Sequence, residues 1–139
     1  MESNQTNEIK FINLTGREIR VFSIDSCDTV VQGNCTSLVP KDGEEPLMVI
    51  PPSGTVAKIT QIRRQVTVLD GIPVNQIFIG KVEGLPSPGE FNTFYIVSPS
   101  IVTVETTRND LLIVDSTVRD KNGNIIGCTS FGRFINPYV

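Results

Sequence analysis

The sequence of 139 residues contains no histidine, only one alanine and only seven leucines. Without histidine, the chain has no Ser-His-Asp or Cys-His nucleophilic system, no imidazole acid–base chemistry and no histidine-containing zinc site. Most common hydrolase and protease mechanisms are therefore excluded. We expect a protein that is not an enzyme, with no catalytic residues, no metal site and no cofactor.

The sequence also lacks a long hydrophobic run and a strong net charge. No apolar run approaches the roughly 20 residues that cross a bilayer, and residues 1–10 are polar, without the hydrophobic region of a signal peptide. Twelve basic and fifteen acidic residues give a net charge of −3, which provides no drive toward nucleic acid or anionic lipid. We expect a cytoplasmic protein without a polymeric nucleic-acid or membrane partner.

Cysteine is scarce: Cys27, Cys35 and Cys128 form an odd set without CxxC spacing. In a reducing cytosol, free thiols are expected, with Cys128 buried in a strand. A bridge between Cys27 and Cys35 is the alternative in an oxidising compartment, because the two flank a short loop.

What the sequence has in abundance is β-branched residues: 16 valines, 16 isoleucines and 13 threonines. These side chains fit a pleated sheet and lose rotamer freedom in a helix. The length and this composition predict one all-β domain over residues 1–139, a small sandwich or barrel of roughly eight to ten short strands. Because edge strands in so small a body need protection, we expect a homo-oligomer.

The order of apolar runs and turn residues predicts where the strands lie. Residues 9–14 and 18–24 are expected to form a hairpin around Thr15-Gly16, and residues 25–46 to be an insertion carrying a small hairpin. The run 91–97 is the most apolar and should be a central strand. Further strands are expected at 47–51, 55–62, 65–69, 72–74, 76–82, 111–114, 117–119 and from 125 onward.

One short helix is expected after Ser98, over residues 100–106. Ser98 has the character of a helix N-cap and Pro99 that of a first helical residue, although residues 101–104 are poor helix formers. The apolar and aromatic residues of the tail, 129–139, should pack against the core or a neighbouring subunit.

Several short sequence motifs occur in a characteristic order along the chain. They are Ile12-Asn13-Leu14-Thr15, Pro51-Pro52-Ser53-Gly54-Thr55-Val56-Ala57, Gly71-Ile72-Pro73-Val74, Gly80-Lys81-Val82-Glu83-Gly84-Leu85-Pro86, Tyr95-Ile96-Val97-Ser98, Arg108-Asn109-Asp110-Leu111-Leu112, and Val118-Arg119-Asp120 with residues 123–128. In these motifs the chain resembles a family of small β-rich proteins encoded by phages, prophages and bacteria. The resemblance covers most of the chain except residues 25–46.

That resemblance implies a small phage-associated protein, acting in the host cytoplasm if a phage encodes it. Compact phage β proteins of this kind are similar in character to immune-evasion sponges, which bind cyclic nucleotide or cyclic ADP-ribose signals. This analogy of size and context implies a small nucleotide-like ligand as partner.

The residues themselves offer a first candidate site at Tyr95, Ser98, Arg108 and Asp110. A ligand with a base and phosphates needs an aromatic ring on which the base stacks and a guanidinium that donates to the phosphate. It also needs a carboxylate or amide that hydrogen-bonds the polar edges of the base. Ser98 adds backbone amides at the start of the expected helix. In the alternative interpretation, Tyr95 is a core or sheet-face residue and Arg108 pairs with Asp110 on the surface.

A second candidate lies on the expected Asn122-Gly123 hairpin. Counting outward from the turn pairs Arg119 with Ile126 and Val118 with Gly127, which brings Arg119 close to Gly127. A strand glycine can mark the approach of a ligand. In the alternative interpretation, Gly127 marks only a bulge and Arg119 is solvated.

Other charged residues carry less chemistry. Arg63-Arg64 is expected to be a solvated turn between two strands, and the alternative is that one of the two arginines faces a ligand or a partner's acidic group. The spacing of Asp110, Asp115 and Asp120 matches no known metal loop. Cys128 lacks an activating base and is expected to be a buried hydrophobe.

The leading hypothesis is therefore a non-enzymatic, phage-associated protein that sequesters a small nucleotide-like ligand and counters host defence. The first alternative is a structural or assembly protein of a virion. The second is a phosphodiesterase that uses carboxylate-bound metal.

Overall fold

A computed structural model describes residues 8–105 and 107–133, and this part of the chain is built almost wholly from strands. The strands are β1 (Lys10–Asn13), β2 (Ile19–Val21), β3 (Cys27–Gln32), β4 (Cys35–Pro40), β5 (Met48–Ile50), β6 (Lys58–Leu69), β7 (Ile72–Glu83), β8 (Thr93–Ile96), β9 (Leu111–Arg119) and β10 (Ile125–Gly132). They are joined by a 3-10 turn (Ile24–Ser26) and one short helix, α1 (Pro99–Val102). The prediction of an all-β fold with a short helix after Ser98 is confirmed. Thr106 of the expected helix, and residues 134–139 of the expected apolar tail, lie outside the described residues.

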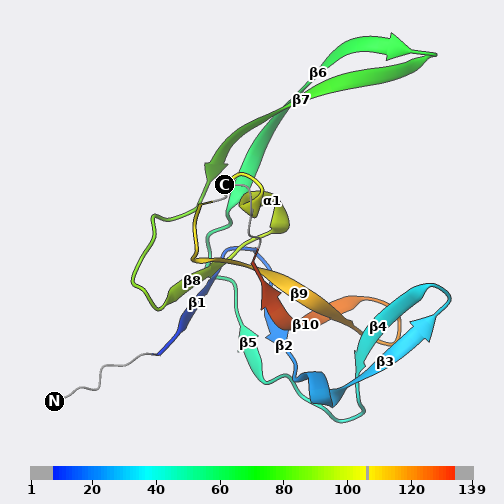
Figure 1. Cartoon of the computed structure of the whole chain (residues 1–139), viewed down its shortest axis with the longest axis vertical. Helices are drawn as coiled ribbons and strands as arrows, with labels where there is room; N and C mark the ends of the chain where they lie inside the picture. Colours follow the sequence, from blue (N-terminus) through cyan, green and yellow to red (C-terminus); the bar gives the residue numbers. More distant parts are fainter. Residues whose placement is uncertain (1–7, 106, 134–139) are drawn as a thin grey trace.

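The main sheet follows the order β1-β8-β9-β10-β2-β5, with β4 paired to β9 and β3 paired to β4 (Figure 1). β8 is parallel to both β1 and β9, and β2 is parallel to β10, whereas the β9–β10 and β2–β5 pairs are antiparallel. The sheet curls into a nearly closed barrel, so that the strands at the two ends of the order, β1 and β5, approach each other.

The side chain of Asn13 joins these two ends. Its amide nitrogen donates to the carbonyl of Ile50 at 3.1 Å and to that of Arg17 at 2.6 Å. Its carbonyl oxygen accepts from the main-chain N–H of Thr15 at 2.9 Å. Asn13 is only 1% exposed, so its side chain supplies buried hydrogen bonds at this junction. Among the described strands, β1 and β5 are not paired with each other.

Apolar side chains lie on both sides of the sheet, because successive residues of a strand point to opposite faces. In β8, Tyr95 belongs to a cluster with Leu14, Ile101 and Leu111, whereas Ile96 belongs to the second cluster with Ile19, Ile50 and Cys128. The central position predicted for this strand is thus confirmed.

Helix α1 has a single turn. Pro99 occupies its first turn after the N-cap Ser98, and Ile101 and Val102 are buried. The burial of these two residues holds a helix that its β-branched sequence would not favour alone.

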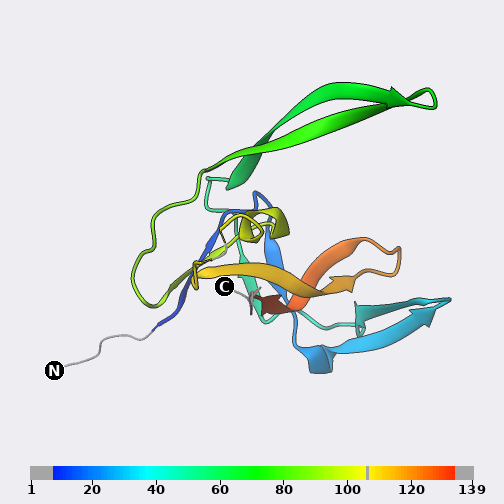
Figure 2. The ribbon, with the colours of Figure 1, turned by 45° about the horizontal axis from the view of Figure 1, so that its top comes forward.

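Two hairpins project from the barrel in different directions (Figures 1 and 2). The β3–β4 hairpin pairs Thr29 with Leu38 and confirms the hairpin expected within 25–46. The β6–β7 hairpin turns at Asp70-Gly71, where φ is 52° and 81°. Positive φ at both central residues matches the right-handed twist of the flanking strands, which is why Asp-Gly marks a hairpin.

Two expectations about the path of the chain are wrong, one about a hairpin and one about a turn. β1 and β2 do not form a hairpin around Thr15-Gly16, because β1 pairs with β8 while β2 pairs with β10 and β5. The hydrogen bonds of Asn13 redirect the chain there. Arg63-Arg64 is not a turn either, since both residues lie inside β6 and face β7.

The expected register of the β9–β10 hairpin is partly wrong. Val118 pairs with Gly127 as predicted, but Arg119 pairs with Ile125 instead of Ile126. The cause is a bulge between Ile125 and Gly127. The turn is wider than two residues, because the Asp120 carboxylate accepts from the main-chain N–H groups of both Asn122 and Asn124 at 2.9 Å.

The register of the β3–β4 hairpin also separates two cysteines. Cys27 lies opposite Pro40 at one end, and Cys35 lies opposite Gln32 at the other. At about 3.3 Å per residue, the length of β3 exceeds the Cα separation of roughly 7 Å that a disulfide tolerates. A bridge between Cys27 and Cys35 within one chain is therefore incompatible with this fold.

Among the described helices, none has the length and apolarity needed to cross a bilayer.

Candidate functional site

The six residues predicted to bind a ligand fall in three separate places. Tyr95, Arg108 and Asp110 lie together at the end of β8 and the start of β9. Ser98 and Gly127 line a second hollow. Arg119 lies in a third, beside the β3–β4 hairpin.

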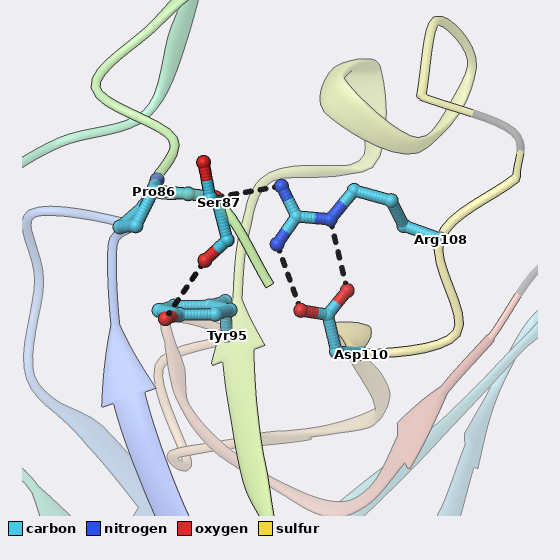
Figure 3. Close-up of polar contacts among 5 residues, drawn as sticks. All are labelled: Pro86, Ser87, Tyr95, Arg108 and Asp110. Atoms are coloured by element: carbon cyan, nitrogen blue, oxygen red, sulfur yellow. Dashed lines mark hydrogen bonds and ion pairs between the residues drawn. The ribbon is translucent and has the colours of Figure 1, made fainter. Parts of the chain in front are cut away.

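Arg108 and Asp110 form a forked ion pair (Figure 3). The guanidinium donates to the two carboxylate oxygens, Nε to Oδ1 at 2.9 Å and Nη2 to Oδ2 at 2.7 Å. Only 13% of the Arg108 side chain and 17% of the Asp110 side chain are exposed. The hydrogen bonds to Asp110 raise the pKa of Arg108 further, so the guanidinium stays charged. Partial burial and the bidentate geometry make this pair more rigid than an ordinary surface pair.

The same guanidinium ties a loop to the sheet. Its Nη1 donates to the carbonyl of Pro86 at 2.7 Å, and its carbon lies 5.7 Å from the centre of the Tyr95 ring. The Tyr95 hydroxyl donates to the carbonyl of Ser87 at 3.5 Å (Figure 3). Since Tyr95 is only 5% exposed, its ring cannot serve as a stacking platform for a base.

Residues 88–91 of the loop, with Thr93 and Phe94 of β8, form one wall of an open hollow of about 450 Å³. The other wall is residues 107–110. Phe91, at the rim, is 84% exposed, the most exposed of the large apolar side chains among the described residues. The exposed aromatic ring of this region is therefore Phe91, which the sequence predicted to lie inside a central strand, and not Tyr95.

Phe91 leaves the strand because of a turn. The main-chain N–H of Thr93 donates to the carbonyl of Glu90 at 3.0 Å, so residues 90–93 reverse direction before β8 begins. The preceding Pro88-Gly89 was the available signal that the strand starts late.

This hollow combines groups that suit a nucleotide-like ligand. Phe91 offers an exposed ring, Arg108 keeps two of its five N–H groups beyond the three hydrogen bonds described, and Asn109 offers a polar edge. The lining also holds two carboxylates, Glu90 and the engaged Asp110. A guanidinium held in place loses little entropy when it binds a phosphate. The hollow is open, so one copy of the chain encloses a ligand only in part.

The hollow beside Ser98 and Gly127 has a different character. Its volume is about 460 Å³, and its lining includes Ile19, Val97 and Ile125. The Ser98 hydroxyl lies 3.2 Å from that of Ser100 and makes no capping hydrogen bond. This hollow is mostly apolar and does not match the phosphate-binding role expected for Ser98.

Gly127 is explained by packing within the chain. A Cβ atom at this position would collide with the main-chain oxygen of Arg20 and the ring of Phe22. The close approach that a strand glycine marks is thus made by the segment 20–22 rather than by an external group.

Arg119 lies in a polar cleft of about 370 Å³ between the β3–β4 hairpin and the 119–123 turn. Its Nη1 donates to the carbonyl of Gly123 at 2.7 Å. Nearby, Lys121 pairs with Asp42 at 3.2 Å across two largely exposed side chains. Charges of both signs surround this cleft, so it has no clear preference for an anion.

Acidic residues do not converge anywhere in the part of the chain that the structure describes. Within residues 8–105 and 107–133, no group of three or more Asp, Glu or Cys side chains could hold a metal ion. Asp110 is engaged by Arg108, and Asp120 organises its own turn.

Comparisons with models of protein families, with curated proteins and with solved structures find no match to this chain. Its function must therefore be argued from its own residues.

Proposed function

We propose that this protein is a non-enzymatic binding protein that captures a small nucleotide-like ligand, of the cyclic nucleotide or cyclic ADP-ribose class, in the hollow between Phe91 and Arg108. Sequestration of such a signal would counter host defence if a phage encodes the protein. The observation that carries the proposal is the exposed ring of Phe91 beside a guanidinium that Asp110 and Pro86 hold in position.

Of Phe91 and Arg108, the exposed ring of Phe91 is the more unusual feature. A phenylalanine that is 84% exposed gains almost nothing from the fold, whereas stacking of a base on an aromatic ring contributes about 1–3 kcal/mol. Asp110 balances the charge of the neighbouring guanidinium, which therefore serves as a fixed hydrogen-bond donor to a phosphate or a base edge. The ring and these donors serve the two halves of one nucleotide.

The shallowness of the hollow supports a site shared between subunits. Ligand pockets usually bury most of a small ligand's surface, and the hollow of one chain is too open for that. A second subunit over this face would complete the enclosure, consistent with the homo-oligomer that the sequence predicts.

Isothermal titration calorimetry with a panel of cyclic dinucleotides, cyclic ADP-ribose and inorganic phosphate tests this proposal. We expect at least one nucleotide to bind, and Phe91→Ala to weaken it by about 5- to 150-fold, the equivalent of 1–3 kcal/mol. Leu47→Ala is the matched control, because Leu47 is 73% exposed and lies outside the hollow. Equal affinity of both variants would contradict the site.

A second pair of variants tests the guanidinium. Arg108→Lys keeps the charge but loses the fork, so we expect weaker binding of the same nucleotide. Arg20→Lys is its control, since Arg20 pairs with Glu18 on the exposed surface at 2.8 Å. Unchanged affinity in Arg108→Lys, with the fold intact by circular dichroism, would remove Arg108 from the site.

The projecting hairpins favour a second candidate, a structural or assembly protein (Figure 2). Such a subunit would need extended arms and no ligand. Native mass spectrometry separates the two functions: protein that stays ligand-free throughout the nucleotide panel, and that is found in purified virions, would favour assembly.

A further inference from the structure

Residues 60–81 of the β6–β7 hairpin, here called the arm, stand away from the barrel (Figures 1 and 2). The arm is anchored at its base, where Ile59 and Val82 pack against the cluster around Leu14 and Tyr95. Beyond that base, every residue of the arm except Val74 is exposed.

The exposed surface of the arm is unusually apolar. It carries eight large apolar side chains that are each between 46% and 65% exposed: Ile62, Val66, Val68, Leu69, Ile72, Ile77, Phe78 and Ile79. Four of them, Ile72, Ile77, Phe78 and Ile79, lie on β7, and the other four lie on β6. A two-stranded hairpin alone is only marginally stable in water, so this arm is suited to being covered.

The arm also presents two free strand edges. β6 and β7 pair only with each other among the described strands, so half of the main-chain N–H and C=O groups of each point outward. Free edges are templates for pairing with a further strand.

Charge distinguishes the two edges. The middle of β6 contains Arg63 and Arg64, so pairing of β6 with itself about that point would bring like charges together. The corresponding stretch of β7, residues 74–80, contains no charged residue. Like charges directly opposite each other destabilise a sheet, so β7 is the edge suited to pairing with its own copy.

We propose that the arm is a dimerisation element, in which β7 pairs antiparallel with β7 of a second copy about a two-fold axis at Phe78. In this register, Phe78 faces the second copy's Phe78, and Ile77 faces the second copy's Ile79. The four strands form one sheet in the order β6-β7-β7-β6. Antiparallel pairing about a two-fold axis is self-complementary, as a closed dimer requires.

The cross-strand register of the arm supports this centre. Ile62 lies directly opposite Phe78 within the hairpin. Pairing at Phe78 therefore aligns Ile62, Phe78 and their two copies in one apolar row across four strands. Aromatic and β-branched neighbours of this kind stabilise a sheet. The arm shares no residue with the ligand hollow, so this inference does not depend on the proposed function.

Two measurements on the full chain test the proposal. In sedimentation equilibrium we expect the wild type to dimerise and Phe78→Lys to weaken dimerisation by at least about thirtyfold, because it places two lysines at the axis. Val66→Lys, on the far strand and similarly exposed at 53%, should retain the dimer.

Cysteine cross-linking provides a second, direct test. In a background of Cys27→Ser and Cys35→Ser, Phe78→Cys should form a disulfide-linked dimer on mild oxidation, because directly opposite Cβ atoms lie about 4.5–5.5 Å apart. Val66→Cys should not. A monomeric wild type, or cross-linking of Val66→Cys with none of Phe78→Cys, would overturn the proposed pairing.

Discussion

At the scale of the residue, Gly127 shows how one missing side chain permits two elements to pack. β10 passes so close to Arg20 and Phe22 that a Cβ atom has no room. We expect Gly127→Ala to lower the free energy of unfolding by about 1–3 kcal/mol, the usual cost of overpacking.

Gly132 is the matched control on the same strand, because a Cβ there would meet its neighbours at an ordinary 3.4 Å. Urea denaturation of Gly127→Ala and Gly132→Ala gives the comparison. Equal stability of the two variants would show that segment 20–22 yields easily.

Asp120 makes the stability of one turn depend on pH. Hydrogen bonds to its carboxylate, first from the main chain of Asn124, lower the pKa of Asp120 below its ordinary value. Because the folded-state pKa is depressed, the charge stabilises the fold above the ordinary carboxyl pKa of about 4, and that contribution is lost as the pH falls through lower values.

Asp120→Asn keeps an acceptor oxygen but has no charge to lose. We therefore expect the wild type to have the higher Tm near pH 7, and the difference to shrink as the pH falls below about 4. Thermal melts of both proteins across this range provide the measurement, and a difference that grows in acid would contradict the sign.

The three thiols should differ in reactivity. Burial raises the pKa of Cys128, which is fully inaccessible, whereas Cys35 is exposed and Cys27 half-buried. Since the thiolate is the reactive form, iodoacetamide at about pH 8 should alkylate Cys35 first and Cys128 only after unfolding. Peptide mass spectrometry measures the order, and rapid labelling of native Cys128 would refute its burial.

At the scale of the element, closure of the barrel depends on Asn13 instead of a strand ladder. Asn13→Ala would leave the carbonyl of Ile50 and the N–H of Thr15 without their partner. We expect a loss of about 1–3 kcal/mol in the free energy of unfolding.

Asn122→Ala removes an exposed amide and serves as the comparison for Asn13→Ala. Hydrogen exchange should also show faster exchange in β1 and β5 of Asn13→Ala than in β9. Unchanged protection of both end strands would mean that Asn13 does not hold them together.

Elements joined by short turns were the part of the fold that the sequence could predict. Asp70-Gly71 and the Gly33-Asn34 region specify their hairpins locally, and Ser98-Pro99 marks the start of α1. The parallel pairs were not predictable, because β1–β8 and β2–β10 join residues far apart in the chain. No local pattern encodes such a register.

The candidate site was predictable only in part, for the same reason. Residue types alone brought Tyr95, Arg108 and Asp110 together, and the structure confirms that they are neighbours. That Tyr95 is covered while Phe91 is exposed depends on the loop 84–92, whose position follows from the hydrogen bond between Arg108 and Pro86. Ser98, Arg119 and Gly127 lie elsewhere because the barrel separates the ends of their strands.

At the scale of the whole molecule, the barrel carries two surface features, the arm and the hollow at Phe91. The arm offers an interface to a second copy, and the hollow at Phe91 offers a partly enclosed binding surface. Both are incomplete in one chain, so we propose that the protein functions as an assembly and binds its ligand without changing it.

The most direct test of this account is the chemical fate of the bound ligand. The wild-type protein would be incubated with the nucleotide that it binds in calorimetry, then denatured, and the released small molecules separated by chromatography. We predict full recovery of the unchanged nucleotide, in proportion to the protein present and reduced in Phe91→Ala. Accumulation of a hydrolysed product with repeated turnover, abolished by substitution of an aspartate, would contradict it.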